Sequence, residues 1–388
     1  MSMRRQWTVR QLQVLHRHGD RSPLHNVFQG VSQQEHDERA LWQTRMPRQR
    51  DLAHLTQQYA VRHTAATTGA SGSAGTIIPP QAEPFGTLTT TGLEQMKQRG
   101  SRLRELCDRE GFAVGALSVP RVQVFSNSYL RTQRSVQSLL SGLFHDRPEM
   151  TPLIEVLPPA TDMINTYAAF PEIADLKNAL ELVDDTFGER ERQMAPRKAE
   201  LMRLLPLYAN GSVPFTWMTT ADYFTCRDAH DVPLIPHTSE HLDSTLTHLS
   251  FRFQQFYSQQ TILGLVAGRL MRNVINEVMP KQRFIDMHRA VQGHDDRKDL
   301  VIYSGHDVSV LAALHAIGAQ CVHETKWWPT YASALTFELL EDERGNHRVR
   351  ARLDGQPLVQ TSGDGAAECA FADFEDNVLA KLGPSSAR

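Results

Sequence analysis

Two arginines and a histidine lie within five positions of one another in residues 15–23, which read Leu-His-Arg-His-Gly-Asp-Arg-Ser-Pro. Arg17 and Arg21 can each present a planar fork of N–H donors to a tetrahedral oxyanion, and His18 lies between them with a nucleophilic ring nitrogen. Guanidinium groups are rarely buried unless an anion meets them. The pattern therefore predicts a phosphate-handling site with a histidine nucleophile.

The backbone around these side chains indicates how they are positioned. Residues 9–15 lean apolar and predict a short buried strand that ends at the motif. Gly19 allows the chain to turn without a Cβ penalty, and Pro23 fixes the exit of the turn. We therefore expect the charged side chains to follow directly on the end of a buried strand.

Two Gly-His-Asp triplets occur later in the chain and must be distinguished. The first, residues 293–295, precedes a charged run that is typical of a solvated loop. The second, residues 305–307, follows the compact apolar segment 299–304, which predicts another strand. Because ligands of open α/β sheets bind at the carboxyl ends of strands, we assign His306 and Asp307 to the chemistry and place the first triplet at the surface.

A third arginine falls at a similar place in the predicted fold. Residues 121–126 predict a strand and residues 127–144 a helix, so Arg131 lies near a helix start just beyond a strand. Helix N-termini favour anions, which makes Arg131 a candidate phosphate ligand. Two alternatives stay open: Arg134 takes this role, or Arg131 lies on the helix surface.

Residues 17–23 also match the R-H-G-x-R-x-P signature of the histidine acid phosphatases, the acid-phosphatase and phytase branch of the histidine phosphatase superfamily. The chain resembles this family over most of its length. Residues 86–95 resemble its G-x-L-T-x-x-G-x-x-Q segment, which is mostly structural, and residues 331–333 resemble its Y-A-S. The resemblance implies that residues 305–307 contain the family's catalytic His-Asp pair.

One family segment is matched only in part. Arg131 stands at the second arginine of the family's R-S-T-D-x-x-R-T segment, and the resemblance implies that it binds phosphate. Phe125 stands where the first arginine is usual, and residues 127–128, Asn-Ser, replace Thr-Asp. Residues 139–144 resemble the lysophosphatidic acid phosphatase subgroup, which implies a lysophospholipid substrate such as lysophosphatidic acid.

The 388 residues suffice for one large α/β unit with an insertion. We expect a three-layer, doubly wound α/β sheet formed by residues 1–150 and 296–388. Residues 151–295 change to a helical pattern and predict a mainly α-helical cap insertion over one edge of the sheet. Near the C-terminus, residues 334–340 and 347–353 predict a β-hairpin.

The composition argues against several classes of protein. A formal net charge of −3 offers no basic field for nucleic acid. No run approaches the roughly 20 apolar residues of a membrane helix, so we expect no stable membrane insertion. Residues 1–10 are basic without the apolar core of a secretory signal, which favours a cytoplasmic protein, with mitochondrial import or a removed leader left open. The four cysteines allow two disulfides or free thiols, and no pattern fixes the oligomeric state.

Together these residues predict hydrolysis of a small-molecule phosphate monoester. The three arginines neutralise the roughly two negative charges of the ester, and His306 donates a hydrogen bond to it. Unprotonated His18 attacks phosphorus to form a phosphohistidine, while its other ring nitrogen donates to a backbone carbonyl. Asp307 protonates the leaving alkoxide and then activates water. Since the arginines take the place of a metal, no metal or other cofactor is expected.

Three other interpretations stay open. His16 and His18 on one face of a strand end suit a metal-dependent hydrolase, with His306 or Asp307 completing the shell, although the two neighbouring arginines repel a divalent cation. Loss of activity on chelation would distinguish that case. A phosphoryl mutase of the same superfamily would transfer phosphate to a second sugar or glycerate carbon. A phosphate-binding module without activity would not turn over an aryl phosphate.

Several polar or aromatic residues outside these motifs allow two interpretations. His25 and Asn26 either touch a substrate or lie in a solvated loop. Trp327 and Trp328 either line an apolar substrate groove or pack under the sheet edge. His230, His237 and His241 in the predicted cap have no paired carboxylate at metal-ligand spacing, so we expect them to be ordinary polar histidines.

Overall fold

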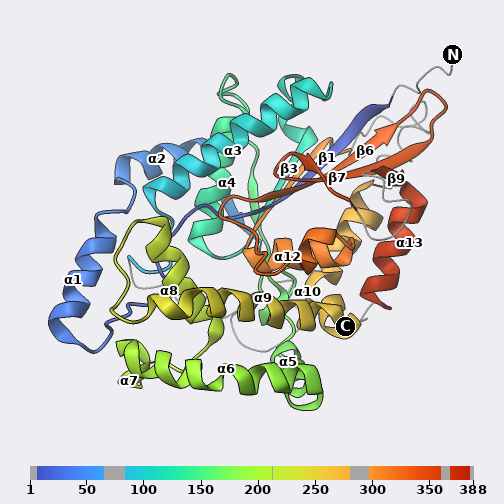
Figure 1. The fold of residues 1–388 in the computed structure, drawn as a ribbon. Coiled ribbons are helices and arrows are strands. Elements are labelled where there is room, and N and C mark those ends of the chain that lie inside the picture. The colour runs from blue at the N-terminus through green and yellow to red at the C-terminus, as the bar shows by residue number, and fades with distance from the viewer. Residues whose placement is uncertain (1–6, 65–83, 212, 280–296, 360–367, 385–388) are drawn as a thin grey trace, which may run out of the picture.

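The computed structural model describes residues 7–64, 84–211, 213–279, 297–359 and 368–384, and these contain one nine-stranded mixed sheet (Figure 1). The strands are β1 (Thr8–Arg17), β2 (Val61–His63), β3 (Val122–Ser126), β4 (Ile154–Val156), β5 (Leu300–Gly305), β6 (Ala334–Glu341), β7 (His347–Leu353), β8 (Gln356–Pro357) and β9 (Glu368–Ala370). Their spatial order is β2-β4-β3-β5-β1-β6-β7-β8, and β9 pairs with β7.

The middle of the sheet determines where a site can form. β3, β5 and β1 are adjacent and parallel, with Ser126 in register with Ser304 and Arg17 with Gly305. Their carboxyl ends therefore meet at one edge of the sheet, where ligands of doubly wound folds bind. β6 and β7 run antiparallel beyond β1 and form the predicted C-terminal hairpin.

Helices cover both faces of the sheet (Figure 1). α3 and α4 pack on each other over one face, whereas α10, α12 and α13 pack together over the other. The helices are α1 (Ser32–Gln43), α2 (Gln49–Gln58), α3 (Thr90–Arg109), α4 (Leu130–Leu143), α5 (Glu172–Val183), α6 (Asp185–Leu204), α7 (Pro206–Ala209), α8 (Trp217–Ala229), α9 (Leu242–Ser258), α10 (Gln260–Arg272), α12 (Asp307–Ala316) and α13 (Phe371–Leu382). This arrangement confirms the three-layer α/β class.

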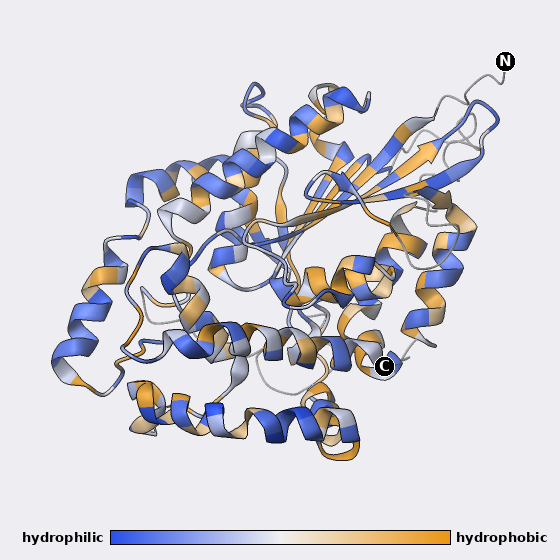
Figure 2. Cartoon of the chain, in the orientation of Figure 1, coloured by the Kyte–Doolittle hydropathy of each residue, from blue (hydrophilic) through white to orange (hydrophobic). Residues whose placement is uncertain are grey.

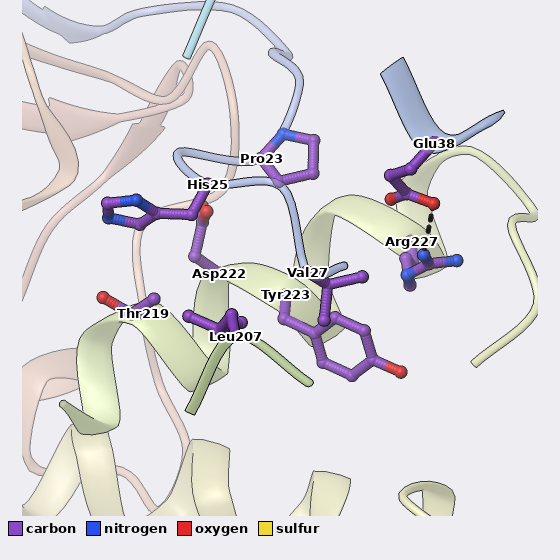
Figure 3. Close-up of a pocket in the computed structure, with 9 residues that line it drawn as sticks. All are labelled: Pro23, His25, Val27, Glu38, Leu207, Thr219, Asp222, Tyr223 and Arg227. Carbon is purple, nitrogen blue, oxygen red and sulfur yellow. Dashed lines mark hydrogen bonds and ion pairs between the residues drawn. The ribbon is translucent and has the colours of Figure 1, made fainter. Parts of the chain in front are cut away.

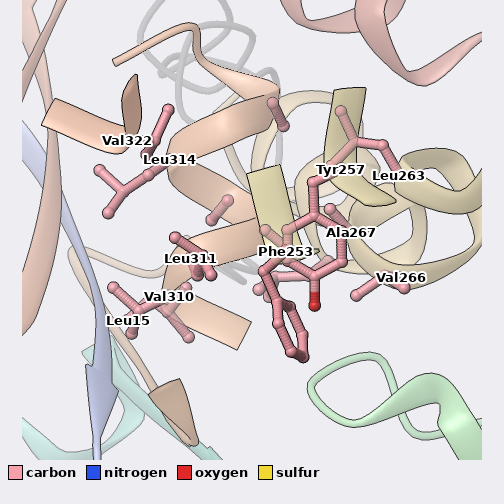
Figure 4. Close-up of a cluster of buried hydrophobic side chains, with 14 of the residues drawn as sticks. Leu15, Phe253, Tyr257, Leu263, Val266, Ala267, Val310, Leu311, Leu314 and Val322 are labelled. Carbon is pink, nitrogen blue, oxygen red and sulfur yellow. The ribbon is translucent and has the colours of Figure 1, made fainter. Parts of the chain in front are cut away.

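Each face of the sheet has its own hydrophobic core. Successive side chains of a strand point to opposite faces, so Val14 of β1 joins the α3–α4 core whereas Leu15 joins the core beneath α12. Figure 4 shows Leu15 beside Val310 and Leu311 of α12. The strands are largely apolar, and polar residues lie mainly on the outer helices (Figure 2). Residues 11–17 of β1 are all buried, which fits a strand that is covered on both faces.

The stretch between β4 and β5 is helical throughout its described part. It contains α5 to α10 and no strand in residues 157–211, 213–279 or 297–299. α5, α6 and α7 lie farthest from the sheet, and α8 and α9 lie between them and the sheet (Figure 1). The helical character predicted for this stretch is present, while the exact boundaries of a separate cap stay a prediction.

One predicted helix boundary differs from the structure. α4 begins at Leu130 instead of residue 127, because the Asn127 side chain accepts from the Tyr129 N–H at 3.1 Å and holds the chain in a turn. Residues 25–84 form a long polar segment of the sequence, and its described part contains α1 and α2. Most residues of these helices are polar and exposed, so the sequence gives little sign of the few buried residues, such as Trp42, that hold the helices in place.

Some expectations fall outside the described residues. The Gly-His-Asp triplet at 293–295 lies there, as does most of the Ser- and Gly-rich stretch before residue 84. Within the described part, no helix is long and apolar enough to cross a bilayer. Cys107, Cys226 and Cys321 are free thiols there.

Candidate active site

The predicted chemical residues come together where β1, β3 and β5 end. Arg17 is the last residue of β1, and His306 and Asp307 follow β5 at the start of α12. The rings of His18 and His306 lie 5.5 Å apart in an edge-on arrangement. Residues almost 290 positions apart in sequence thus face one space at the edge of the sheet.

His18 is held as a neutral ring with a defined orientation. Its Nδ1 lies 2.8 Å from the carbonyl oxygen of Gly19, which can only accept, so Nδ1 carries the proton and Nε2 does not. This is the backbone carbonyl contact that the sequence analysis expected. Burial, together with the charges of Arg131, Arg17 and Arg21, lowers the pKa of His18 well below 6.5. Nε2 is therefore an unprotonated nucleophile even in mild acid.

Arg17 connects both strand ends to the loop before β6. Its guanidinium donates to the Pro329 carbonyl at 2.6 Å and lies 3.1 Å from an Asp307 carboxylate oxygen. The same oxygen accepts from the Trp328 indole N–H at 3.1 Å. Burial alone would raise the pKa of Asp307, but Arg17 and the Trp328 hydrogen bond outweigh it and lower this pKa to about 2. Asp307 is thus ionised when no ligand is present.

Arg21 is paired with a residue that the sequence analysis did not identify. Asp222 of α8 lies 2.7 Å from its guanidinium, and both side chains are less than a tenth exposed. Asp222 also accepts from the Leu24 N–H at 2.7 Å, so one carboxylate holds both the arginine and the chain that follows it. Cys226, one helical turn further along α8, lies 3.7 Å from the same guanidinium.

Arg131 lies inside the site and not on the helix surface. It is 9% exposed, and its guanidinium stacks 4.2 Å from the ring of Tyr129. Burial and the neighbouring charge of Arg21 lower the pKa of Arg131 to about 10. Two buried cations beside each other indicate a site built for an anion. Arg134 is only half-buried.

His306 has an unusual set of neighbours. Its Nε2 lies 2.6 Å from the amide nitrogen of Asn127, whose oxygen already accepts from Thr132 and Tyr129. Burial and the charge of Arg131 lower the pKa of His306 well below 6.5, so the ring is neutral and its Nε2 can accept from the Asn127 amide. Asn127 thus holds the His306 ring in place beside His18.

The turn that carries His18 is fixed by close backbone contact with α3. A Cβ added at Gly19 would lie 2.3 Å from the Gly92 carbonyl oxygen, and one at Gly92 would lie 2.1 Å from the Asp20 carbonyl oxygen. Thr89 caps α3 and also donates to the Asp20 carboxylate, which lies 2.7 Å from His230 Nε2 at the end of α8. The structural role expected for residues 86–95 thus includes direct support of the catalytic turn.

His25 and Asn26, for which the sequence allows two interpretations, have different environments. His25 lines a small cavity beside Asp222, together with Pro23, Leu207 and Thr219 (Figure 3). Asn26 is buried and binds the backbone of Phe28 and Glu35, so it is structural. The ion pair between Glu38 and Arg227 closes the far side of this cavity (Figure 3).

The metal interpretation finds no matching geometry. His16 is fully buried in β1, and its Nδ1 lies 3.0 Å from the Arg17 carbonyl, so it donates to the backbone. Among the described residues, the one group of three or more possible ligands within 4.8 Å consists of Glu200, Glu240 and His241. That group lies on α6 and before α9, so His16 and His18 do not share a ligand shell with His306 or Asp307.

Known proteins match this chain over most of its length. A model of the histidine phosphatase superfamily (branch 2) matches residues 8–166 and 215–354. Counting factor 60 of Dictyostelium discoideum is 25% identical over 98% of this chain and 88% of its own length. Two bovine relatives are lysosomal acid phosphatase, 25% identical over 75% of this chain and 69% of its own length, and lysophosphatidic acid phosphatase type 6, 24% identical over 86% and 74%.

Solved structures of phosphatases share the fold at low sequence identity. A phytase of Klebsiella sp. ASR1 covers 99% of this chain and 98% of its own length, with a TM-score of 0.62 and 13% identity. A multiple inositol polyphosphate phosphatase of Bifidobacterium longum covers 100% and 96%, with a TM-score of 0.59 and 11% identity. The family predicted from residues 17–23 is confirmed: the chain belongs to branch 2 of the histidine phosphatase superfamily and is a phosphatase of the acid phosphatase and phytase type.

Proposed function

We propose that this phosphatase hydrolyses its monoester through a phosphohistidine formed on His18 Nε2. The observation that carries the proposal is the neutral, backbone-oriented ring of His18 beside three buried arginines. Burial and those cations keep Nε2 unprotonated, and the same cations attract the negatively charged ester. The roles given below to each side chain are part of this proposal.

Binding of the phosphate group would rearrange the ion pairs of the empty site. Arg17, Arg21 and Arg131 each present N–H donors to the equatorial oxygens and neutralise their charge. His306 would donate to a further oxygen once its Nε2, which accepts from the Asn127 amide in the empty site, carries a proton. The phosphate oxygens would then accept from all of these donors, which supports in-line placement of phosphorus against Nε2 of His18.

Proton transfer would pass through Asp307. In the first step the Nε2–P bond forms, the P–O bond of the ester breaks, and the leaving oxygen takes a proton from Asp307. In the second step a water oxygen attacks phosphorus, the N–P bond breaks, and Asp307 takes the proton of that water. Since Asp307 is ionised in the empty site, it must gain its proton on binding. A monoanionic ester carries this proton, and its charge on Arg17 raises the pKa of the nearby carboxyl.

The charges favour a substrate with one phosphate group. Arg17 and Arg21 are already paired with Asp307 and Asp222, so the three guanidinium groups are opposed by two carboxylates. The excess of one positive charge suits a substrate with a single phosphate group. The rings of Tyr129, Tyr331 and Trp328 lie beside these groups: Tyr129 stacks on Arg131, Tyr331 on Arg17, and Trp328 binds Asp307. We propose a phosphate on an apolar organic group, such as lysophosphatidic acid.

The first experiment tests the nucleophile. His18→Ala should abolish turnover of p-nitrophenyl phosphate, and wild-type protein quenched during turnover of a radiolabelled ester should carry acid-labile, base-stable label. His36→Ala, an exposed histidine of α1, is the matched control and should keep both activity and label. Label that persists in His18→Ala, or wild-type activity in that variant, would refute the mechanism.

The second experiment tests the substrate. The kcat/KM should be highest for lysophosphatidic acid, which combines one phosphate with a large apolar group. It should be lower for a small sugar phosphate, which lacks the apolar group, and lowest for phytate, which carries many phosphates. A higher kcat/KM for phytate than for lysophosphatidic acid would overturn the substrate proposal and leave the mechanism intact.

A further inference from the structure

A second polar cavity lies away from the active site, on the face of the sheet that α3 covers. It has a volume of about 320 Å³ and is enclosed by α3, the start of β6 and the turn between β7 and β8. This size is at the lower end of the range for small-molecule sites, which is about 300–1,000 Å³.

Arginines dominate one side of this cavity. Arg102 and Arg109 project from α3 at positions separated by two helical turns, with Glu105 between them. In the described part of the chain, the side chains of Arg102 and Arg109 form no hydrogen bond or ion pair. An ordinary solvated helix face would pair Glu105 with one of these arginines at i,i+3 or i,i+4. Their guanidinium donors are instead available to a ligand.

The floor of the cavity carries an independent sign of a missing partner. Thr336 of β6 is 2% exposed, and its hydroxyl has no hydrogen-bond partner among the described residues. A buried hydroxyl without a partner is unfavourable, because it has lost its hydrogen bonds to water. A ligand oxygen that reached the floor would remove this penalty. An apolar ligand has no atom that can form a hydrogen bond with this hydroxyl, so the cavity favours an oxygen-rich molecule.

The third arginine joins the cavity to the catalytic turn. Arg99 pairs with Asp354 at 2.7 Å and donates to the Ala332 carbonyl at 2.9 Å. Ala332 in turn donates from its N–H to the carbonyl of His18 at 3.1 Å. Ala332 has a φ of 60°, a backbone conformation that is strained for alanine and must be held by such contacts. A charge placed in the cavity would therefore act within two hydrogen bonds of the nucleophile.

We propose that this cavity binds a small metabolite with a phosphate or carboxylate group, held by Arg102 and Arg109 and reaching the hydroxyl of Thr336. The cavity, the two available guanidinium groups and the buried hydroxyl support one another. The site is separate from the catalytic arginines, which lie at the carboxyl ends of the strands.

Equilibrium dialysis with radiolabelled orthophosphate tests the site. The wild-type protein should bind two phosphates per chain in the millimolar range, and R102A/R109A should bind one. The control R197A/R203A removes two exposed arginines of α6 and should bind two. All four arginines are exposed, so each double variant is expected to fold, which circular dichroism would verify.

A second arm separates the two anion types. Radiolabelled malonate is dialysed against the same proteins, and a site that takes it identifies a carboxylate ligand, whereas binding of orthophosphate alone identifies a phosphate ligand. Either result supports the proposal if R102A/R109A abolishes it. One phosphate and no malonate per wild-type chain, or equal binding by wild type and R102A/R109A, would overturn it.

Discussion

Two walls of the active site contribute different things. The first wall consists of the strand ends, with Arg17, His18, His306 and Asp307, whose donors and nucleophile face the substrate. The second is α8, whose polar groups face the first wall and not the substrate. Asp222 pairs with Arg21, and His230, which follows α8, lies 2.7 Å from the Asp20 carboxylate. In the proposed mechanism the first wall performs the chemistry, and the contacts of the second wall hold the first in position.

The difference between the two walls shows how buried arginines are stabilised when no anion occupies the site. Arg21 is 6% exposed, and a buried guanidinium without a counter-charge would be strongly unfavourable. Asp222 supplies that charge from about 200 positions further along the chain. The strand-end wall should therefore be sensitive in turnover, whereas the α8 wall should be sensitive in stability. Four predictions test this contrast, beginning with the largest effect.

Asp307→Asn should lower kcat about 100- to 10,000-fold, because the amide cannot supply a proton to the leaving alkoxide. Its hydrogen bond with Trp328 Nε1–H can persist through the amide oxygen, but Arg17 loses its carboxylate partner, so the unfolding midpoint should also fall. Steady-state kinetics and urea denaturation measure the two effects. The loss should be much smaller for p-nitrophenyl phosphate, whose leaving group needs no proton. An equal loss for alkyl and aryl esters would contradict the role of Asp307 as the acid.

Asp222→Ala should act mainly on stability. It leaves the buried Arg21 without its partner, which is expected to cost about 3–5 kcal/mol in the free energy of unfolding. Added orthophosphate should stabilise this variant more than the wild type, because the anion replaces the lost charge. Urea denaturation with and without phosphate measures both. Asp228→Ala, an exposed position on the same helix, should change neither quantity. Stability equal to the wild type would disprove the supporting role of α8.

Gly92→Ala tests the contact between α3 and the catalytic turn. The new Cβ would lie 2.1 Å from the Asp20 carbonyl oxygen, so the turn must move, at a cost of about 1–3 kcal/mol and a loss of kcat. Gly268→Ala on α10 is the matched control, since nothing lies within 4 Å of its Cβ. There the helix should gain about 0.5–1 kcal/mol. Equal effects at both glycines would show that the close approach has no functional importance.

The strand-end wall could be predicted from the sequence because most of its features lie close together in the chain. A strand, a turn and a cluster of charges follow one another within residues 9–23, and the second Gly-His-Asp triplet follows an apolar run. The rule that ligands gather at the carboxyl ends of strands then joined segments that lie far apart. The same reasoning predicted the α/β class and the hairpin of β6 and β7.

The α8 wall could not be predicted from the sequence, because no local pattern indicates its contact with the motif. Asp222 and Cys226 occur in an ordinary helix, and the sequence predicts only a polar histidine at His230. Their role depends on which face of α8 meets the motif, which is decided by packing across the insertion. Asn127 was noticed only as a departure from the family pattern. Its contact with His306 is tertiary and has no signal in the spacing of residues.

The smallest predicted effect concerns pH and separates turnover from stability. Burial and the arginine charges hold the pKa of His18 well below 6.5, so the nucleophile stays unprotonated as the pH falls from 7 to 5. Over that interval kcat/KM should hold or rise, since the monoanion of the ester, with a second pKa of about 6, brings the proton that Asp307 needs.

The free energy of unfolding should instead decrease in mild acid. Below pH 6.5 the unfolded chain binds a proton at residue 18 that the folded chain does not, so the free energy of unfolding decreases as the pH falls. Parallel measurements of kcat/KM and urea denaturation should therefore diverge in mild acid, and a decline of kcat/KM with an apparent pKa near 6.5 on the acidic side would show that the strand-end wall does not keep His18 neutral.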